Sequence, residues 1–517
     1  MAEPPTETPT ETATETAADS GDLDALGYRQ ELHRSLGPFA SFCSGFSFVS
    51  ILTTVFELFA LGYGFGGPAF FWTWPLVFAG QFAVCLVFAE LAARYPIAGA
   101  IYQWSRRVST DPLGWFAGWL MLLGYIVSVA AIAIALQAVL PPVWSGFQLY
   151  GTDTSPTSHD GAVNAIVLGS ICIAVCAVIS SFGVTKMAAL TRIGVTCEIV
   201  GIVAVLAFLF AHAERGPQVV FSTLDVQGAG AAYLPAFLAS ILMAAYVMYG
   251  FDSAAELSEE TNDPRRTAPL AITRCMLVSA VGGGLLLLAT LMAAPDLRAP
   301  ELATDGVAWV VTAQLGDTVG RIVLAVVAIS IFSAALAISA SATRVMFSMA
   351  RDGLLPFARP LARVSLRTGT PLLPGVVVAL LSIGVLLLNL GQSGVFASVT
   401  SVSVVIVYLA YLLVTVPLLW QRLRRHPELS VPQVGYFSLG RWGLPVNVVA
   451  VVFGVFLLVD VAWPRPEVYD PDGGHWYLQY SSLLITGGAL VLGALAYTVM
   501  RRQQTAAPAR AGSRAGG

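Results

Sequence analysis

Long apolar stretches alternate with short polar connections along almost the whole chain. Most apolar stretches reach the roughly 20 residues that an α-helix needs to cross the hydrocarbon core of a bilayer. The pattern therefore predicts an all-α integral membrane protein with about twelve transmembrane helices. The predicted spans cover residues 39–66, 68–93, 113–140, 161–185, 190–213, 230–258, 270–294, 319–347, 371–390, 393–420, 443–463 and 478–500.

The first and the sixth of these spans carry a helix-start pattern near their middle. Thr54-x-x-Glu57 and Ser253-x-x-Glu256 both have the capping-box spacing that marks a helix N-terminus. A helix that starts in mid-membrane leaves backbone N–H groups without partners, which is tolerated where the break lines a cavity. Paired breaks in corresponding parts of a chain are typical of a transporter binding site.

Composition supports a membrane protein throughout. The 517 residues are 56% hydrophobic and only 11% charged, whereas about a quarter of the residues are charged in a soluble domain. We therefore expect the lipid bilayer as the surroundings and no nucleic-acid partner. Residues 1–22 form a Thr/Glu/Pro tract that predicts a disordered tail and no signal peptide. Residues 23–38 then form a pre-membrane segment, and residues 501–517 a C-terminal tail.

The basic residues predict the orientation of the spans. If the N-terminus lies inside, nearly all of the 27 Lys and Arg residues fall in inner segments, as the positive-inside rule requires. This places both termini, with residues 23–38 and 501–517, in the cytoplasm and predicts a multi-pass protein of the plasma membrane. The exceptions on the outer side are Arg215, Arg298, Arg321 and Arg465.

The positions of the two breaks predict an internal repeat. The breaks lie in the first and the sixth spans, so each unit has five spans and the two units start on opposite sides of the membrane, as an inverted repeat requires. The first unit covers residues 39–213 and the second covers residues 230–420. Two further spans, in residues 443–500, lie beyond the repeat.

Several motifs, in this order and at these spacings, give the chain a family resemblance. The sequence from Leu26 to about Ala496 resembles the amino acid–polyamine–organocation (APC) superfamily, and within it the amino acid/choline transporter branch. This resemblance implies a LeuT-like five-plus-five core and secondary transport of amino acids or related amines. The matching segments are Leu26–Gly37, Tyr63–Pro68, Ala89–Trp104, Leu257–Pro269, Ala350–Pro356 and Phe437–Asn447.

The break in the first span is the candidate position for a substrate carboxylate. Unwinding there frees backbone N–H groups and directs the positive end of the outer half-helix at the cavity. The resemblance implies that the substrate α-amine binds freed carbonyls of the sixth span, at Tyr246 to Gly250. The alternative is that the hydroxyl groups only cap helix ends. The residues of the first break are Ser50, Ile51, Leu52, Thr53 and Thr54.

Glu57, Tyr246 and Tyr249 are further candidates for substrate contact. Glu57 either caps the Thr54 N–H group or serves as a counter-charge for a substrate amine or as a proton carrier. It departs from the branch, in which small or hydroxyl residues are usual at this place. Tyr246 lies where related permeases carry an aromatic residue that closes over the substrate, and such a ring also stacks on an ammonium group. The alternative for both tyrosines is simple packing.

Asp252, Ser253 and Glu198 complete the candidate set. Asp252 and Ser253 lie at the start of the inner half of the sixth span, where a cap explains both. Glu198 is an isolated carboxylate inside the fifth span, near a place where some superfamily members carry a lysine whose charge substitutes for bound sodium. A protonatable acid at this position is a candidate for ion coupling. Glu90, at the inner end of the second span, is expected to form ion pairs with nearby arginines.

These features predict a secondary active transporter that moves an amino acid, γ-aminobutyrate (GABA), choline or a polyamine by alternating access. Proton-coupled uptake is the first expectation and exchange with a counter-substrate the second. Motifs for zinc, nucleotide phosphate or a catalytic nucleophile are not found, so we expect no metal, no cofactor and no enzyme activity. Two alternatives stay open, a nutrient sensor that binds without transport and a polytopic membrane enzyme.

Overall fold

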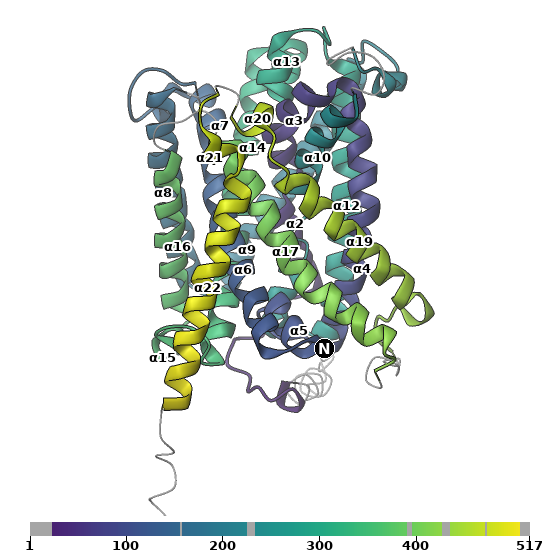
Figure 1. The fold of residues 1–517 in the computed structure, drawn as a ribbon. Helices are drawn as coiled ribbons and strands as arrows, with labels where there is room; N and C mark the ends of the chain where they lie inside the picture. The colour runs from purple at the N-terminus through teal and green to yellow at the C-terminus, as the bar shows by residue number, and fades with distance from the viewer. Residues whose placement is uncertain are drawn as a thin grey trace, which may run out of the picture.

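The computed structural model describes residues 23–155, 158–224, 233–389, 395–426, 435–470 and 473–506. Within these ranges the chain is helical, and its β-structure is limited to one parallel bridge between Leu36 and Thr261. The long helices run side by side as one bundle, with α5 at one end and α13 at the other (Figure 1). The predicted all-α fold is thus confirmed. The tail predicted over residues 1–22 lies outside the described residues.

The helices that cross the bundle match the predicted spans. Nine helical runs in the described residues are long and apolar enough to cross a bilayer, and one run, Pro38–Arg94, holds the first two spans. Two shorter apolar helices, α10 and α16, complete the predicted set of about twelve. The crossing helices are α2 (Pro38–Val49) with α3 (Ile51–Gly66), α4 (Thr73–Arg94), α6 (Asp111–Ile134) with α7 (Leu136–Val143), α8 (His159–Ser181), α9 (Val184–Ala211), α10 (Tyr233–Val247) with α11 (Ser253–Glu256), α12 (Pro264–Ala293), α14 (Gly306–Arg351), α16 (Leu372–Leu386), α17 (Val395–Leu423), α19 (Gly443–Ala462) and α22 (Ser481–Ala506).

Short elements cover the two ends of the bundle. Helix α14 is kinked at Gly316, so the eighth span begins beyond this residue, as predicted. Helix α22 continues to Ala506, and the C-terminal tail therefore begins later than the predicted residue 501. The short helices are η1 (Gly67–Trp72), α5 (Ala100–Val108), η2 (Ser145–Phe147), η3 (Pro217–Phe221), η5 (Ser258–Glu260), α13 (Pro300–Thr304), α15 (Ala358–Leu361), η6 (Leu387–Asn389), η7 (Gly440–Trp442), α20 (Pro466–Tyr469) and α21 (Trp476–Gln479).

Both predicted mid-span breaks are present. Helix α2 ends at Ser50, whose φ of 39° and ψ of 70° lie in the left-handed region, and α3 restarts at Ile51. Helix α10 ends at Val247, and α11 begins only at Ser253, with Gly250 between them at a φ of 88°. Helix α3 packs against α10, and α2 packs against α11. The two interrupted spans therefore lie side by side at the centre of the bundle.

The capping box predicted for the first break is wrong. Helix α3 begins at Ile51, one turn earlier than the pattern predicts, and Thr54 lies within it. The Thr54 hydroxyl donates to the Ser50 carbonyl at 2.9 Å, and neither oxygen of Glu57 accepts a hydrogen bond from a described residue. The helix starts earlier because the left-handed residue Ser50 already reverses the chain and its carbonyl accepts from the Thr54 N–H group at 2.9 Å.

The capping interpretation is also wrong for the sixth span. Asp252 precedes α11, but neither it nor Ser253 makes a side-chain cap. The Ser253 hydroxyl instead donates across the break to the Ser44 carbonyl of α2 at 3.4 Å. The Glu256 carboxylate accepts no hydrogen bond of good geometry from the described residues. It lies near the backbone N–H groups of Gly99, Ala100 and Ile101, at the start of α5. Tertiary contacts therefore replace the local caps at this break.

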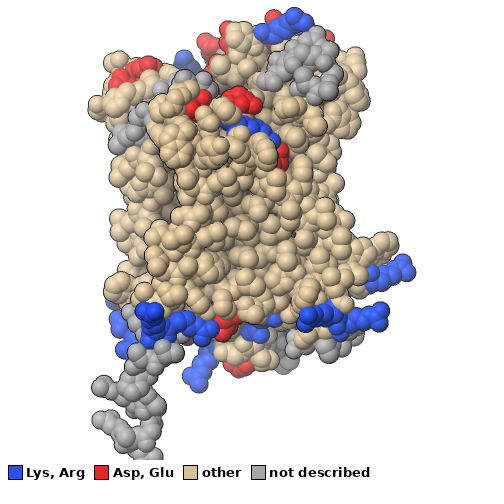
Figure 2. All heavy atoms as spheres, viewed as in Figure 1, with Lys and Arg blue, Asp and Glu red and all other residues tan. Residues whose placement is uncertain are grey.

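The surface has an apolar belt between two polar ends. Lys and Arg side chains gather at the end where α5 and α15 lie, while uncharged residues cover the middle (Figure 2). Peripheral helices expose large apolar side chains, such as Val452 on α19 and Leu492 on α22, which are 65% and 62% exposed. Such a belt is the surface that a bilayer requires. At this end, hereafter the basic end, Arg106 and Arg107 lie on α5 and Arg359 lies on α15, and Arg106 pairs with Asp352 just after α14.

Candidate functional site

The two breaks are in direct contact through an aromatic ring and a glycine. The Phe48 side chain of α2 packs onto the backbone of Gly250, where a β-carbon would lie only 1.9 Å from Cδ1 of Phe48. Gly250 therefore has two reasons to be glycine, its positive φ and the ring against it. The Phe48 ring also contacts the rings of Tyr125 and Tyr249 edge-on, at centroid distances of 5.3 Å and 6.1 Å.

A carboxylate from another helix occupies part of the first break. The Glu198 Oε1 atom, on α9, accepts from the Leu52 N–H group at 3.1 Å and from the Ser50 hydroxyl at 3.1 Å. An anion is stabilised at this helix N-terminus by the unpaired N–H groups and by the helix dipole. Ile51 and Thr53 also lie in the first turn of α3, where backbone N–H groups have no partner within their own helix. The break therefore places such donors beside the Glu198 carboxylate.

The side chains at the first break divide between polar and packing roles. The Thr53 hydroxyl accepts from the Ser50 hydroxyl at 2.9 Å, so these two line the same polar position. The Ile51 side chain packs near Gly283 of α12, and Leu52 packs near Gly201 of α9. Ile51 and Leu52 can therefore offer only their backbone to a ligand.

Two tyrosines from other helices hold the break in the sixth span. The Asp252 carboxylate accepts from Tyr125 of α6 at 2.8 Å and from Tyr411 of α17 in a shorter hydrogen bond. The Tyr411 hydroxyl also accepts from the Gly250 N–H group at 3.1 Å. Because both oxygens of Asp252 are bonded to these tyrosines, this residue ties the break to α6 and α17.

A group of hydroxyls lies next to this clamp. The Tyr249 hydroxyl is 2.9 Å from the hydroxyl groups of both Ser128 on α6 and Ser403 on α17. Tyr246 packs edge-on against Tyr249, with ring centroids 5.3 Å apart. The carbonyl groups from Val247 to Tyr249 accept no hydrogen bond from the described residues. The sixth span thus offers carbonyl acceptors where the first span offers the N–H donors of a first turn.

Four residues of this centre are not predicted from the sequence, namely Tyr125, Ser128, Ser403 and Tyr411. Each is a hydroxyl-bearing residue in an apolar span, and all are buried. The sequence gives no other indication of their role. The residues of the sixth span to which they bond lie 121 to 159 positions away along the chain. Of the predicted residues, Ser50 and Leu52 of the first break meet Glu198, and Ser253 of the sixth span meets α2 at the Ser44 carbonyl.

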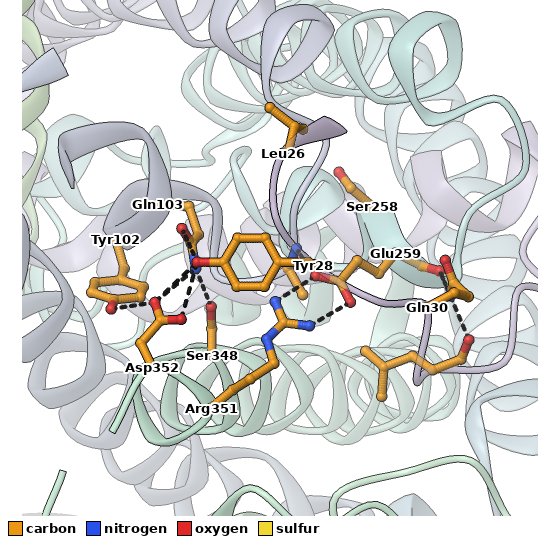
Figure 3. A network of polar contacts seen from close by, with 12 residues as sticks. Leu26, Tyr28, Gln30, Tyr102, Gln103, Ser258, Glu259, Ser348, Arg351 and Asp352 are labelled. Atoms are coloured by element: carbon orange, nitrogen blue, oxygen red, sulfur yellow. Dashed lines mark hydrogen bonds and ion pairs between the residues drawn. The ribbon is translucent and has the colours of Figure 1, made fainter. Parts of the chain in front are cut away.

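The basic end of the bundle is closed by buried ion pairs (Figure 3). Arg351, at the end of α14, binds Glu259 with both guanidinium nitrogens, at 3.0 Å and 2.7 Å. Arg344 binds Glu260 through Nη2, at 2.9 Å and 3.2 Å to the two oxygens, and through Nε at 3.3 Å. These pairs join the end of the sixth span to the end of the eighth.

Asp352 is the centre of a second group at the same end (Figure 3). It accepts from Tyr28 at 3.0 Å and from Tyr102 at 2.6 Å, and it pairs with Arg106. Burial and the nearby Asp352 charge raise the pKa of Tyr28 above its ordinary value, so Tyr28 stays a neutral donor. A cavity of about 400 Å³ lies beside Tyr28 and Arg107. The pre-membrane segment is therefore fixed across this end.

Glu90 has the role expected from the sequence. Its carboxylate pairs with Arg94 one turn later at 3.5 Å and with Arg422 at the end of α17, and it also accepts from Ser438 at 3.3 Å. The prediction that Glu90 forms ion pairs near the basic end is thus confirmed. Within the described part of the chain, no group of three or more His, Cys, Asp or Glu residues is arranged to hold a metal ion.

Comparison with known proteins gives one consistent family. The profile described as "Amino acid permease" matches residues 36–489. Amino-acid permease BAT1 of Arabidopsis thaliana is 26% identical, over 91% of this chain and 92% of its own. Amino-acid permease 2 of Neurospora crassa is 25% identical, over 89% and 84%. The branched-chain amino acid permease BcaP of Lactococcus lactis is 25% identical, over 56% and 63%.

Proposed function

The chain belongs to the amino acid permease family of the APC superfamily, and we propose that it moves an amino acid or small amine across the plasma membrane by alternating access. The observation that carries this proposal is the contact between two interrupted spans, at Phe48 and Gly250. The first-turn N–H groups of α3 on one break and the carbonyl groups from Val247 to Tyr249 on the other form a polar position at the centre of an apolar bundle. Discontinuous helices of transporters bind their substrates with such groups.

The substrate binds between α3 and α10 in this proposal. Its carboxylate accepts from the first-turn N–H groups of Ile51 and Thr53, beside Ser50 and Thr54, and its α-amine donates to carbonyls of the segment from Tyr246 to Gly250. The edge-on pair of Tyr246 and Tyr249 covers the ligand. This arrangement uses the helix N-terminus for an anion and the unwound carbonyls for a cation, as the helix dipole favours.

Glu198 is the proposed coupling residue. Its ionised carboxylate stabilises the N-terminus of α3 through the Leu52 N–H group, so the charge state of Glu198 and the position of α3 depend on each other. Protonation weakens this attraction and releases the half-helix. Such a link supports proton-coupled uptake. Exchange requires only that the binding site carries a counter-substrate when it turns back to the other side of the membrane.

Alternating access requires two units that move against each other. The two five-span repeats, residues 39–213 and 230–420, each contribute to both moving units, and spans 1, 2, 6 and 7 rock against spans 3, 4, 8 and 9. The ion pairs of Glu259 with Arg351 and of Glu260 with Arg344 cross between these groups. By the positive-inside rule the basic end faces the cytoplasm, and so do both termini. The closed basic end is then the shut inner gate.

Counterflow in proteoliposomes tests this function. Vesicles that contain the purified protein and a high concentration of one unlabelled amino acid are diluted into the same amino acid in labelled form. The proposal predicts transient accumulation of label, for at least one member of a panel of amino acids, GABA, choline and polyamines. Binding without accumulation would indicate a sensor, and chemical conversion without accumulation would indicate an enzyme.

A further inference from the structure

Glu57 is a buried carboxylate for which the described chain supplies no partner. Both of its oxygens are shielded from solvent and accept no hydrogen bond from a described residue. Two other buried acids are bonded, Asp252 by two tyrosines and Glu259 by Arg351. Glu256, whose oxygens also lack a hydrogen bond of good geometry, lies near the backbone N–H groups at the start of α5. Glu57 therefore calls for a partner from outside the chain.

The position of Glu57 directs it toward the proposed substrate site. Glu57 follows Thr53 by four residues and Thr54 by three, so it lies on the helix face that carries the hydroxyls of the break. Its side chain leans toward the helix N-terminus, as side chains in α-helices do. Helix α3 packs against α10, which carries Tyr246, and Tyr249 follows two residues after α10 ends.

The chemistry around Glu57 suits an ammonium or guanidinium group. A carboxylate in a membrane interior is costly unless it is paired with a cation. The two edge-on tyrosine rings, 5.3 Å apart, add faces on which a cation is attracted by the ring electrons. An anionic or purely apolar ligand would leave Glu57 unpaired.

The spacing along α3 sets the length of the ligand. Ile51 and Glu57 are six residues apart, or about 9 Å along the helix axis, and the backward lean of the Glu57 side chain shortens this gap. A ligand with its carboxylate on the Ile51 and Thr53 N–H groups needs a long side chain to bring a second cation to Glu57. Lysine, ornithine and arginine have such a chain, and glycine or alanine does not.

We infer that Glu57 selects basic amino acids, by pairing with the terminal cation of the substrate side chain. This inference rests on the proposed transport function and names its substrate class. Three ligands of similar length separate the contributions: lysine carries both charged ends, norleucine lacks the terminal ammonium group, and cadaverine lacks the carboxylate.

The experiment measures competition by these three ligands for labelled lysine counterflow in proteoliposomes. We expect lysine to compete at roughly 10- to 100-fold lower concentration than norleucine, which is the range for one hydrogen-bonded charge pair. Glu57→Gln should abolish this difference while norleucine binding is kept. Glu301→Gln, at an exposed carboxylate on α13, is the matched control and should preserve the difference.

The outcomes distinguish this inference from the proposed function. Equal competition by lysine and norleucine in the wild type overturns the role of Glu57, even if the Glu57→Gln variant does not fold. Cadaverine competing as well as lysine replaces basic amino acids with diamines as the substrate class and overturns the inference in its stated form. If another amino acid of the panel shows counterflow and lysine does not, the inference fails while the proposed function stands. If no member of the panel shows counterflow, the proposed function fails, and thermal stabilisation of the wild type by lysine over norleucine then decides the inference separately.

Discussion

The ring of Phe48 occupies the space that a side chain on Gly250 would need, with Cδ1 only 1.9 Å from the position of a β-carbon. Phe48 lies two residues before the break in the first span, and Gly250 lies inside the break in the sixth. This contact joins the two interrupted spans directly. A movement of α2 at the first break therefore changes the packing at Gly250 in the second break.

Gly250→Ala should reduce both stability and transport. The added methyl group meets the Phe48 ring, and the φ of 88° is unfavourable for alanine. We expect a loss of roughly 1–3 kcal/mol from overpacking and about 1–2 kcal/mol from the left-handed backbone, read as a lower melting temperature in detergent. Gly384→Ala is the control, because it lies in α16 with open space around it. Equal melting temperatures for the two variants would contradict the contact.

Tyr411→Phe should destabilise the break in the sixth span more than Tyr408→Phe does. Tyr411 donates to the Asp252 carboxylate and accepts from the Gly250 N–H group, whereas Tyr408 makes one long bond of 3.3 Å to the Ala245 carbonyl. A lost hydrogen bond to a buried charged group is worth roughly 1.5–3 kcal/mol. The melting temperatures of both variants test this difference. Equal melting temperatures would contradict a stabilising role for the bonds of Tyr411 to Asp252 and Gly250.

Glu198→Gln should make uptake insensitive to pH while exchange continues. The amide oxygen can still accept from the Leu52 N–H group, but the side chain no longer binds or releases a proton. The measurement is the initial rate of uptake from pH 5 to pH 8, compared with counterflow at each pH. Glu467→Gln, at an exposed position on α20, should keep the wild-type profile. An unchanged profile in Glu198→Gln removes this residue from coupling.

Glu259→Gln should open the basic end of the bundle. Removing one partner of a buried ion pair costs roughly 3–5 kcal/mol, and here that cost falls on the closed arrangement held by Arg351. Opening can be followed by alkylation of Ser258→Cys, since Ser258 is only 1% exposed. The rate should rise when Glu259→Gln is added, and it should fall again in part with the exchanged pair Glu259→Arg and Arg351→Glu.

A gate role for this pair would be contradicted if Ser258→Cys is alkylated at one rate in the wild type, in Glu259→Gln and in the exchanged pair. A partial recovery is expected because Glu259 also accepts from the Ala98 N–H group at 3.0 Å, which an arginine at this position cannot do.

Hydropathy alone predicts the spans, because a bilayer accepts only long apolar helices with satisfied backbone groups. The sequence also places the two breaks correctly, through the unusual polar runs around Ser50 and Gly250. The sequence does not predict which groups form hydrogen bonds at the two breaks. The capping boxes suggest local partners, whereas the structure uses Glu198 for the first break and Tyr125 and Tyr411 for the second.

These partners are hidden from a single sequence for a physical reason. Local caps depend on spacing along one helix, but Glu198 is 146 residues from Leu52, and only packing of α9 near the break brings them together. An isolated carboxylate within an apolar span indicates that Glu198 has a function, but it does not indicate which residue Glu198 contacts. Glu57 is the opposite case, since its spacing suggests a partner at Thr54 that the structure does not use.

The central claim is a polar site between the broken spans that opens by turns to each side of the membrane. The most direct test is alkylation of Ser253→Cys, a position fully buried at the break in the sixth span, by a membrane-impermeant reagent in right-side-out and inside-out vesicles. The account predicts modification from both sides, in different vesicles, and protection by a transported amino acid in each. Modification from one side only, whatever the conditions, would contradict it.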